Sequence, residues 1–354
     1  MRDYGAAPEA HEIEVTVFGP GYGEAIAVHL GSGQWMLVDS CEPLDTKIPA
    51  SLEYLCAIGA PADAVRVIVA SHWHDDHVRG LSKLLDAYPQ ADLFISSVFS
   101  DREALAFVEG NGGPIAPSLT RGTKELAAAI GKTRNFYFAD QRTIVFEETL
   151  CGRSVRVLAL APNAAAQAVA LTHFATYVPI ANAPVMHAPE LKPNIEAIVL
   201  HVEFGEEAVL LGSDLEDYPQ CGWAALVSNA WCLQRRRASA YKVAHHGSKT
   251  GNHVGIWSHL VQQQPVAVLT PFVKGSVSLP TADDRTRVRS DAEAVYITST
   301  SSRRARIATD QLRRMRAIAD KITPVNSGFG AVRLRKQHGS AGWRVELFED
   351  ARML

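Results

Sequence analysis

The stretch SHWHDDH, residues 71–77, places three histidines and two aspartates within seven positions. It follows VRVIVA, which is typical of a short buried strand, and precedes the amphipathic helix pattern LSKLLDAY. On an extended or turning loop, residues two apart point the same way. His72 and His74 can therefore bind one ion, while Asp76 and His77 can turn toward a second. The spacing H-x-H-x-D-H predicts that this chain builds a metal centre at the end of a strand.

Two series of strand patterns end in further residues that can bind metal. IEVTVFG, AIAVHL and WMLVDS form the first series, which ends at Asp39. AIVLHVEFG and EEAVLLGSD form the second, which ends at Asp214, and AYKVAHHGSKT is a strand that runs into a loop with His245 and His246. Helical patterns over TKIPASLEYLCAI, KELAAAIG and WAALVSNAW lie between these strands. We predict an α/β fold with two facing sheets and helices outside, so that loops from both halves meet at one edge.

The C-terminal part is basic. Between Arg285 and Arg344 there are 14 Lys and Arg against 4 Asp and Glu, although the net charge of the whole chain is −3. This part contains the helix pattern TDQLRRMRAIADKI and the hairpin AVRLRKQ-HGSAG-WRVELFE. The hairpin is apolar enough to need a sheet to join. We therefore predict a main domain over residues 1–302 that residues 303–354 complete.

Composition argues against several classes of protein. The five cysteines are scattered and form no C-x-x-C pair, which speaks against a disulfide framework or a cysteine zinc site. The opening MRDYGAAPEAHEIEV has no apolar segment of signal-peptide length. Residues 157–189 contain no Asp, Glu, Lys or Arg, but three prolines interrupt them. A membrane span needs about 20 continuous apolar residues. We predict a cytoplasmic protein that does not enter the membrane.

These motifs, in this order, resemble the metallo-β-lactamase superfamily over roughly residues 13–300. The resemblance implies a four-layer αββα sandwich and a hydrolase domain over residues 1–302. It also implies that Asp39 supports the metal-binding histidines and that Asp214 bridges two ions. Within the superfamily, GPGYGEAIAVHLGSGQWMLVDS, KPNIEAIVLHVEFGEEAVLLGSDLE and YKVAHHGSKT are similar to the hydrolase domain of the ComEC/Rec2 DNA-uptake proteins and their soluble relatives.

The chain departs from the family pattern near the expected first metal site. Most binuclear members have another histidine between the H-x-H-x-D-H loop and the bridging aspartate. The aligned position here is Asn194, and His173 or His187 could take over its role. The relatives also tend to carry His-Pro after HHGS, where this chain has Leu279 before Pro280.

The resemblance and the residue types together predict a binuclear site for two divalent ions, zinc or manganese. Such ions lower the pKa of bound water from 15.7 to about 7, so that hydroxide can attack a carbonyl or phosphorus at neutral pH. Neighbours on an extended strand point opposite ways, so one of His245 and His246 is expected to bind metal and the other to contact substrate. The predicted metal ligands are His72, His74, Asp76, His77, Asp214 and His245. The predicted catalytic residues are Asp76, His246 and Lys249, and the supporting or substrate-binding residues are Asp39, Asn194, Ser248 and Arg79.

Two cations favour an anionic electrophile, so a phosphodiester is the expected substrate class and nucleic acid the expected polymer. A basic track for a phosphate backbone would comprise Arg235, Arg236, Arg237, Arg285, Arg287, Arg289, Arg313, Arg314 and Arg316. These arginines fit a merely solvated face equally well. An alternative activity is hydrolysis of a lactone, thioester or amide, for which residues 157–189 would form an apolar pocket. A further alternative is a non-catalytic protein that is stabilised by metal, whose basic C-terminal helix would dock a protein partner.

Overall fold

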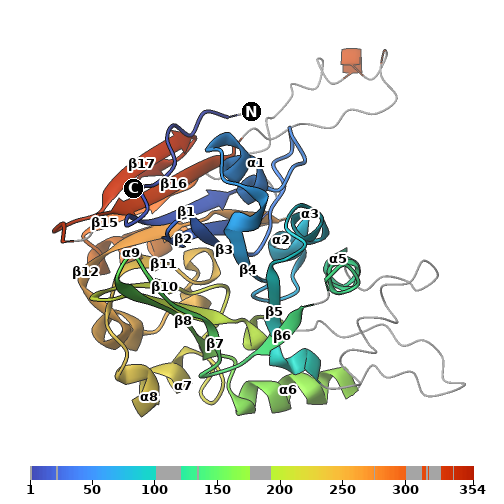
Figure 1. The fold of residues 1–354 in the computed structure, drawn as a ribbon. Coiled ribbons are helices and arrows are strands. Elements are labelled where there is room, and N and C mark those ends of the chain that lie inside the picture. The colour runs from blue at the N-terminus through green and yellow to red at the C-terminus, as the bar shows by residue number, and fades with distance from the viewer. Residues whose placement is uncertain are drawn as a thin grey trace, which may run out of the picture.

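Two large sheets lie face to face in the computed structural model, with helices against their outer sides (Figure 1). The structure describes residues 2–20, 23–100, 121–133, 135–175, 193–274, 276–299, 313–315, 318, 328–337 and 339–354. The first sheet has the order β17-β16-β1-β2-β3-β4-β5-β6, and the second has the order β18-β15-β12-β11-β10-β9-β8-β7.

The bounds of the elements are as follows. The first sheet contains β1 (Ile13–Gly19), β2 (Ala25–Gly31), β3 (Gln34–Val38), β4 (Val65–Val69), β5 (Asp92–Ser96), β6 (Phe136–Ala139), β16 (Gly330–Lys336) and β17 (Arg344–Glu349). The second contains β7 (Ile144–Leu150), β8 (Arg153–Ala161), β9 (Val199–Phe204), β10 (Glu207–Leu211), β11 (Ala238–Lys242), β12 (Val261–Leu269), β15 (Ala294–Ile297) and β18 (Arg352–Met353), and β13 (Phe272–Lys274) pairs with β14 (Val277–Leu279). The helices are α1 (Ala50–Ala57), α2 (Asp75–Val78), α3 (Leu81–Ala87), α5 (Arg121–Ile130), α6 (Ala164–Ala175), α7 (Trp223–Ser228), α8 (Ala230–Leu233) and α9 (Ala282–Asp291). Single-turn segments are η1 (Ala62–Ala64), η2 (Ser97–Ser100), η3 (Pro193–Glu196), η4 (His245–Gly247), η5 (Lys249–Gly251) and η6 (Ile256–Leu260).

Apolar side chains fill the space between the sheets. Val15 and Met36 of the first sheet belong to the same buried cluster as Val157 and Leu200 of the second. A second cluster lies where α1, α3 and α5 cover the outer side of the first sheet, and a third where α7 and α9 cover the second. Each sheet therefore buries both faces, which confirms the predicted α/β sandwich with helices outside.

Each sheet changes from antiparallel to parallel pairing at the strands that precede the predicted ligands. β1, β2 and β3 pair antiparallel, whereas β3, β4, β5 and β6 pair parallel. In the second sheet, β9 and β10 pair antiparallel, whereas β10, β11, β12 and β15 pair parallel. Because the carboxyl ends of parallel strands meet at one edge, the loops after β3, β4, β10 and β11 converge there.

The C-terminal strands complete both sheets. β16 pairs antiparallel with β1 from Gly19 opposite Gly330 to Ile13 opposite Lys336, and β18 pairs with β15 of the second sheet. Figure 1 shows β16 and β17, in red, beside the blue N-terminal strands. The predicted hairpin of residues 331–349 is confirmed, and strands from beyond residue 302 contribute to both layers.

Two predicted helices differ from the structure. The helix predicted over residues 46–58 begins only after Pro49, because proline restricts the residue before it to extended conformations. WAALVSNAW forms two helices, since the Asn229 side chain accepts hydrogen bonds from the backbone N–H groups of Trp231 and Cys232 and begins a new helix, α8. Of the basic helix predicted over residues 309–322, only residues 313–315 and 318 are described. Within the described part of the chain, none of the helices has the length and apolar character needed to cross a membrane.

Candidate metal centre

Asp39 holds one of the predicted ligand histidines in place. It follows β3, and its Oδ2 accepts hydrogen bonds from His77 Nδ1 and from Ser71 Oγ, both at 2.7 Å. Its Oδ1 accepts from the Ser71 backbone N–H at 2.7 Å. The carboxylate thus connects the end of β3 to both ends of the H-x-H-x-D-H loop. Because Nδ1 of His77 carries the proton for Asp39, its Nε2 is free to act as a ligand.

Carboxylates and imidazoles converge in front of His77. Its Nε2 lies 3.4 Å from Asp214 Oδ2 and 3.7 Å from Asp76 Oδ2. His246 Nε2 lies 3.3 Å from the same Asp214 oxygen and 3.5 Å from the same Asp76 oxygen. One potential ligand atom each from Glu24, His77, Asp214 and His246 lie within 4.8 Å of one another, and all four residues are buried.

Three atoms of His77, His246 and Asp214 are buried without a hydrogen-bond partner among the described residues: His77 Nε2, His246 Nε2 and Asp214 Oδ1. Glu24 Oε1 also lacks a hydrogen bond, but it lies 2.5 Å from the Lys242 ammonium. An unpaired buried polar atom costs about 1–3 kcal/mol, so three at one point require an explanation. A cation bound between them would use the lone pairs of both imidazoles and of the carboxylate. Two nitrogen and several oxygen donors are a set that suits zinc or manganese. The residues present therefore fit a divalent metal ion.

The electrostatics of the cluster also favour a cation. Burial by itself would raise the pKa of Asp214, but His246 and His77 hold that pKa well below its usual range. Burial by itself would lower the pKa of His246, but Asp214 and other acidic neighbours raise it to about 9. Without a metal, the histidine protons therefore supply the positive charge that these carboxylates require.

A second group of imidazoles lies beside the first. His72 Nε2 is 3.0 Å from His74 Nδ1, and the rings of His72 and His77 have centroids 4.2 Å apart. Burial lowers the pKa of His72 well below its ordinary value, and repulsion from His77 and His74 acts in the same direction. Neutral imidazole is the form that binds metal. His245 Nε2 lies 3.4 Å from the Asn194 side-chain nitrogen, at the edge of this group.

The two adjacent histidines of the HHGS turn have different surroundings. His246 is buried among the carboxylates and stacks on Phe272, with ring centroids 5.0 Å apart. His245 is partly exposed, and its Nδ1 lies 3.1 Å from Glu216 Oε1 and 3.0 Å from Thr250 Oγ1. Of the two, His246 therefore lies in the carboxylate cluster, and His245 lies beside Asn194. The sequence assignment of His245 to metal and His246 to catalysis stays a prediction, and this geometry favours His246 as the ligand.

Four residues around the centre have left-handed backbone conformations. Asp39, Ser213, His245 and His246 have φ values of 59°, 46°, 47° and 53°. Such conformations are costly for residues other than glycine and are maintained only when the surroundings enforce them. The HHGS turn is held from outside by Arg287, whose guanidinium donates to the Gly247 carbonyl at 2.6 Å. The strain lies at the point where each strand must turn a ligand toward the opposite sheet.

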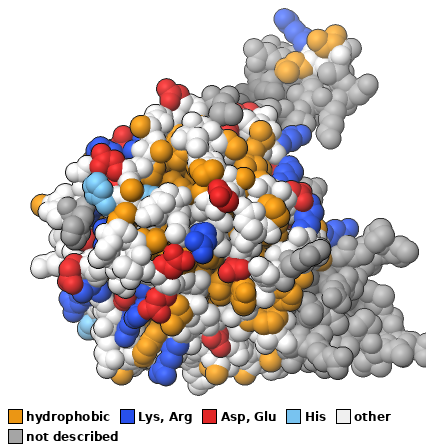
Figure 2. Space-filling view, in the orientation of Figure 1, with side chains coloured by type: hydrophobic (Ala, Val, Ile, Leu, Met, Phe, Trp, Pro, Cys, Tyr) orange, Lys and Arg blue, Asp and Glu red, His pale blue; other side chains and the backbone are white. Residues whose placement is uncertain are grey.

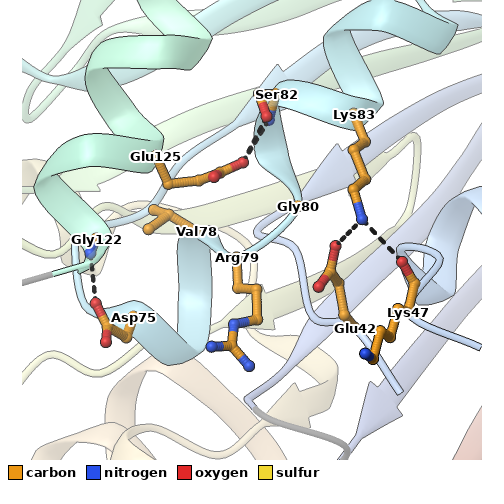
Figure 3. A pocket seen from close by; sticks show the side chains of 10 residues that line it. All are labelled: Glu42, Lys47, Asp75, Val78, Arg79, Gly80, Ser82, Lys83, Gly122 and Glu125. Carbon is orange, nitrogen blue, oxygen red and sulfur yellow. Dashed lines mark hydrogen bonds and ion pairs between the residues drawn. The ribbon is translucent and has the colours of Figure 1, made fainter. Parts of the chain in front are cut away.

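The other predicted residues lie around this cluster. The Ser248 hydroxyl accepts from the Thr250 backbone N–H at 3.3 Å, so it helps to shape its own turn. Lys249 is exposed on that turn. Arg79 lies in a cavity of about 460 Å³ beside α2. Figure 3 shows the Arg79 side chain between Asp75 and the ion pair of Lys83 with Glu42. Asp75 accepts a hydrogen bond from the Gly122 backbone N–H.

Several predicted arginines already have local partners. Arg235 lies over the ring of Trp231, and Arg236 forms an ion pair with Glu206 at 2.7 Å. Arg287 holds the HHGS turn, as described above. Arg313 and Arg314 are exposed. His187 and Arg316 lie outside the described residues, and the side chain of His173 is not described.

Sequence reasoning missed four charged residues next to the site: Glu24, Glu196, Glu216 and Lys242. Glu24 is a lone acidic residue between two apolar strands, and Lys242 is a lone charge in the buried strand β11. A charged residue within an apolar sequence pattern could have identified Glu24 and Lys242, because charged side chains are rarely buried without a partner.

Glu196 makes a testable contribution to the pH dependence of stability. Its buried carboxyl accepts from Trp73 Nε1, next to the ligand histidines, and its Oε2 has no partner among the described residues. Burial raises its pKa from 4.5 to about 8. An acid whose folded pKa is raised lowers the stability as pH rises between the two values, by at most about 1.4 kcal/mol per pH unit.

We therefore expect Glu196→Gln to be more stable than the parent at pH 8.5, by a few kcal/mol at most, and to match it at pH 4. Urea unfolding of chelator-treated protein at both pH values measures this difference. Glu206→Gln, at a residue whose side chain is 84% exposed in its ion pair, is the control. A difference for Glu196→Gln that does not change with pH would contradict the prediction.

Comparisons with known proteins give one match to a family model. Residues 18–93 match the family model of the metallo-beta-lactamase superfamily. A search of curated proteins finds no match. Among solved structures, Zn(2+)-bound PqqB from Methylobacterium extorquens is 14% identical with a TM-score of 0.37, and the match covers 77% of this chain and 84% of that one. Metallo-beta-lactamase SMB-1 bound to 2-mercaptoethanesulfonate is 13% identical with a TM-score of 0.35, over 69% of this chain and 82% of that one. At TM-scores this low, neither structure adds to the argument. Residues 18–93, which carry β2, β3, β4 and the histidine-rich loop, are therefore similar to the metallo-β-lactamase superfamily.

Proposed function

We propose that this protein is a metal-dependent hydrolase that cleaves phosphodiesters, with nucleic acid as its substrate class. The observation that carries the hydrolase assignment is the buried cluster of His77, Asp214 and His246, whose ligand atoms lack other partners. The choice of a phosphodiester rests on charge, since a site built for cations attracts an anionic electrophile. Similarity to ComEC-like domains is part of this proposal and rests on the sequence motifs alone.

The chain's own residues would hold two divalent ions, zinc or manganese. Asp76, His77, Asp214 and His246 would hold one. His72 and His74 would hold the other together with Asp214, with His245 and Asn194 beside them. Bound ions would supply Lewis acidity and a water of lowered pKa.

In the proposed reaction, the protein's own residues would orient the metal ligands and the attacking water and would neutralise charge on the substrate. Asp39 fixes the ring of His77 through a 2.7 Å hydrogen bond. Asp76, whose carboxylate lies 3.5 Å from His246 Nε2, would orient the attacking water and accept its proton. Arg79 and Lys249 would neutralise phosphate oxygens, as arginine and lysine do at phosphate sites.

Fewer of the predicted arginines are available to bind a nucleic-acid backbone than the sequence suggested. Arg235, Arg236 and Arg287 are engaged within the fold. On the face drawn in Figure 2, acidic and basic side chains are interspersed and do not form a single basic surface. Arg79 follows the histidine-rich loop and Lys249 is exposed on the HHGS turn, and this position beside the predicted ligands makes both stronger candidates for recognising phosphate.

The test is a substrate panel with zinc- and manganese-loaded protein. It comprises bis-p-nitrophenyl phosphate, single- and double-stranded DNA, RNA, a lactone and a thioester. We expect cleavage of phosphodiesters, and we expect Arg79→Met to raise KM for DNA about 10-fold with a smaller change in kcat. The control is Arg66→Met, because Arg66 is exposed and paired with Glu148 at 3.1 Å.

Other results of this panel would point elsewhere. Cleavage of the lactone or thioester without any phosphodiester cleavage would overturn the substrate assignment in favour of acyl chemistry. A fully metallated protein that cleaves none of the substrates would favour a metal-stabilised interaction protein. Cleavage that is equally fast in Arg79→Met at every substrate concentration would remove Arg79 from the site.

A further inference from the structure

Behind His246 lies a buried ion pair that joins the two sheets. Glu24 precedes β2 of the first sheet, and Lys242 ends β11 of the second. Lys242 Nζ lies 2.5 Å from Glu24 Oε1, and each side chain is 1% exposed. Replacing such a pair by apolar residues often leaves stability unchanged or improves it, so a buried ion pair is weak evidence for a stabilising role. Its position beside the metal centre indicates a different role.

Backbone packing holds Glu24 at this place. Gly23 has φ +96°, and a Cβ on it would lie 1.5 Å from the Asp76 carbonyl oxygen, so only glycine fits. The Glu24 backbone N–H then donates to that same oxygen at 3.0 Å. The first hairpin is thereby attached directly to the loop that carries the metal-binding aspartate.

Glu24 lies close enough to the cluster to be considered a ligand, but its oxygens are already engaged. Oε1 faces the Lys242 ammonium, and Oε2 accepts a hydrogen bond from Thr270 Oγ1. The ammonium would also repel a metal ion at that carboxylate. Glu24 Oε1 lacks a hydrogen bond, as do His77 Nε2 and His246 Nε2, but it faces the Lys242 ammonium, whereas both imidazole nitrogens face the Asp214 carboxylate. Glu24 therefore belongs behind the ligands.

Thr270 connects Glu24 to His246. His246 Nδ1 lies 3.1 Å from both the carbonyl and the hydroxyl oxygen of Thr270. The carbonyl oxygen can only accept a hydrogen bond, and because the hydroxyl proton is donated to Glu24, the hydroxyl can also only accept from the imidazole. Nδ1 must then carry a proton, which leaves the lone pair of the neutral ring on Nε2, the nitrogen that faces Asp214.

We propose that the Glu24–Lys242 pair is a positioning element that fixes the Nδ1–H tautomer of His246 through the Thr270 hydroxyl and so strengthens divalent-cation binding. This inference rests on the proposed metal site. Lys242 engages Oε1 of Glu24 and leaves Oε2 to accept from the Thr270 hydroxyl. A glutamine at position 24 could donate to the Thr270 hydroxyl, which would then be free to donate to Nδ1 and favour the wrong tautomer.

The test compares Glu24→Gln with the parent in two measurements. Competition with a chromophoric chelator for Zn²⁺ gives the affinity, and long-range ¹⁵N–¹H NMR of the metal-free protein at pH 10.5, above the His246 pKa of about 9, gives the tautomer of the neutral ring. We expect Glu24→Gln to lose about 10- to 100-fold in Zn²⁺ affinity, the usual effect of a residue behind a metal ligand. We also expect a histidine signal to change from the Nδ1–H to the Nε2–H pattern.

The control is Glu207→Gln. Glu207 pairs with Lys336 at 2.7 Å at the opposite end of β10 from Asp214, so this variant should bind Zn²⁺ like the parent. If Glu24→Gln fails to fold, the double variant Glu24→Gln with Lys242→Met removes both charges and leaves no unpaired buried charge. We expect the same loss of affinity from it.

The outcomes separate the two proposals. A parent protein that binds no divalent cation would overturn the metal-dependent function and this inference together. A parent that binds Zn²⁺, with either variant folded and binding equally well, would overturn the positioning role alone and leave the proposed function in place. Loss of affinity without a change of tautomer would also overturn it, because the loss would then have another cause.

Discussion

Replacing Asp214 by alanine is expected to abolish hydrolysis and to lower the metal content of the purified protein. Asp214 Oδ2 lies 3.4 Å from His77 Nε2 and 3.3 Å from His246 Nε2, and its Oδ1 has no hydrogen-bond partner among the described residues. Mutating a residue that only supports a metal ligand typically lowers metal affinity or activity 10- to 100-fold, and mutating a ligand itself should cost more. We therefore expect a loss of more than about 100-fold in kcat/KM for bis-p-nitrophenyl phosphate.

The matched control is Asp217→Ala. Asp217 follows on the same loop, is exposed, and accepts from the Ala224 backbone N–H at 2.9 Å. This variant should lose a helix-capping contact, of order 1 kcal/mol of stability, and keep its metal. Metal content by plasma mass spectrometry and kinetics would be measured on the same preparations. Equal metal content and activity in Asp214→Ala and the parent would exclude this cluster as the centre.

Replacing Arg335 by methionine is expected to destabilise the protein by about 3–5 kcal/mol, because it leaves a buried carboxylate without its partner. Arg335 on β16 donates from Nε to Glu14 Oε2 on β1 at 2.6 Å, and Glu14 is 0% exposed. Glu14 also accepts from Thr16 and Tyr54, but these hydroxyls do not neutralise its charge. The measurement is urea unfolding followed by tryptophan fluorescence.

Arg344→Met is the control for Arg335→Met. Arg344 lies on the neighbouring strand β17, its side chain is 57% exposed, and it pairs with Glu12 at 3.2 Å. Glu12 is buried but keeps Arg335 Nε at 3.8 Å, so losing the exposed Arg344 should cost about 0–1 kcal/mol and the variant should unfold at nearly the parent urea concentration. The comparison also tests the prediction that residues 303–354 complete the main domain. Early loss of the C-terminal strands, with the remaining transition unchanged, would contradict it.

Much of the fold followed from local patterns. The strands IEVTVFG, VRVIVA and AVRLRKQ lie where their patterns predicted. VRVIVA is a short apolar run, and IEVTVFG alternates apolar and polar residues. The division of WAALVSNAW did not follow from its helical period, since the Asn229 cap depends on a single side chain. β6 and β7 were not predicted, and their exposed and buried residues follow no strict alternation.

The sequence by itself predicted a candidate metal centre at a strand end, because three histidines and two aspartates in SHWHDDH have few other uses at that density. It also determined that Asp39 and Asp214 end strands, since apolar runs precede both. Which of His245 and His246 enters the carboxylate cluster was decided only by the tertiary structure. Both adopt left-handed conformations, so the alternation of an extended strand does not apply. The pairing of Glu24 with Lys242, and of Glu14 with Arg335, was likewise decided only by the fold, because each joins strands far apart in the chain whose contact no local pattern encodes.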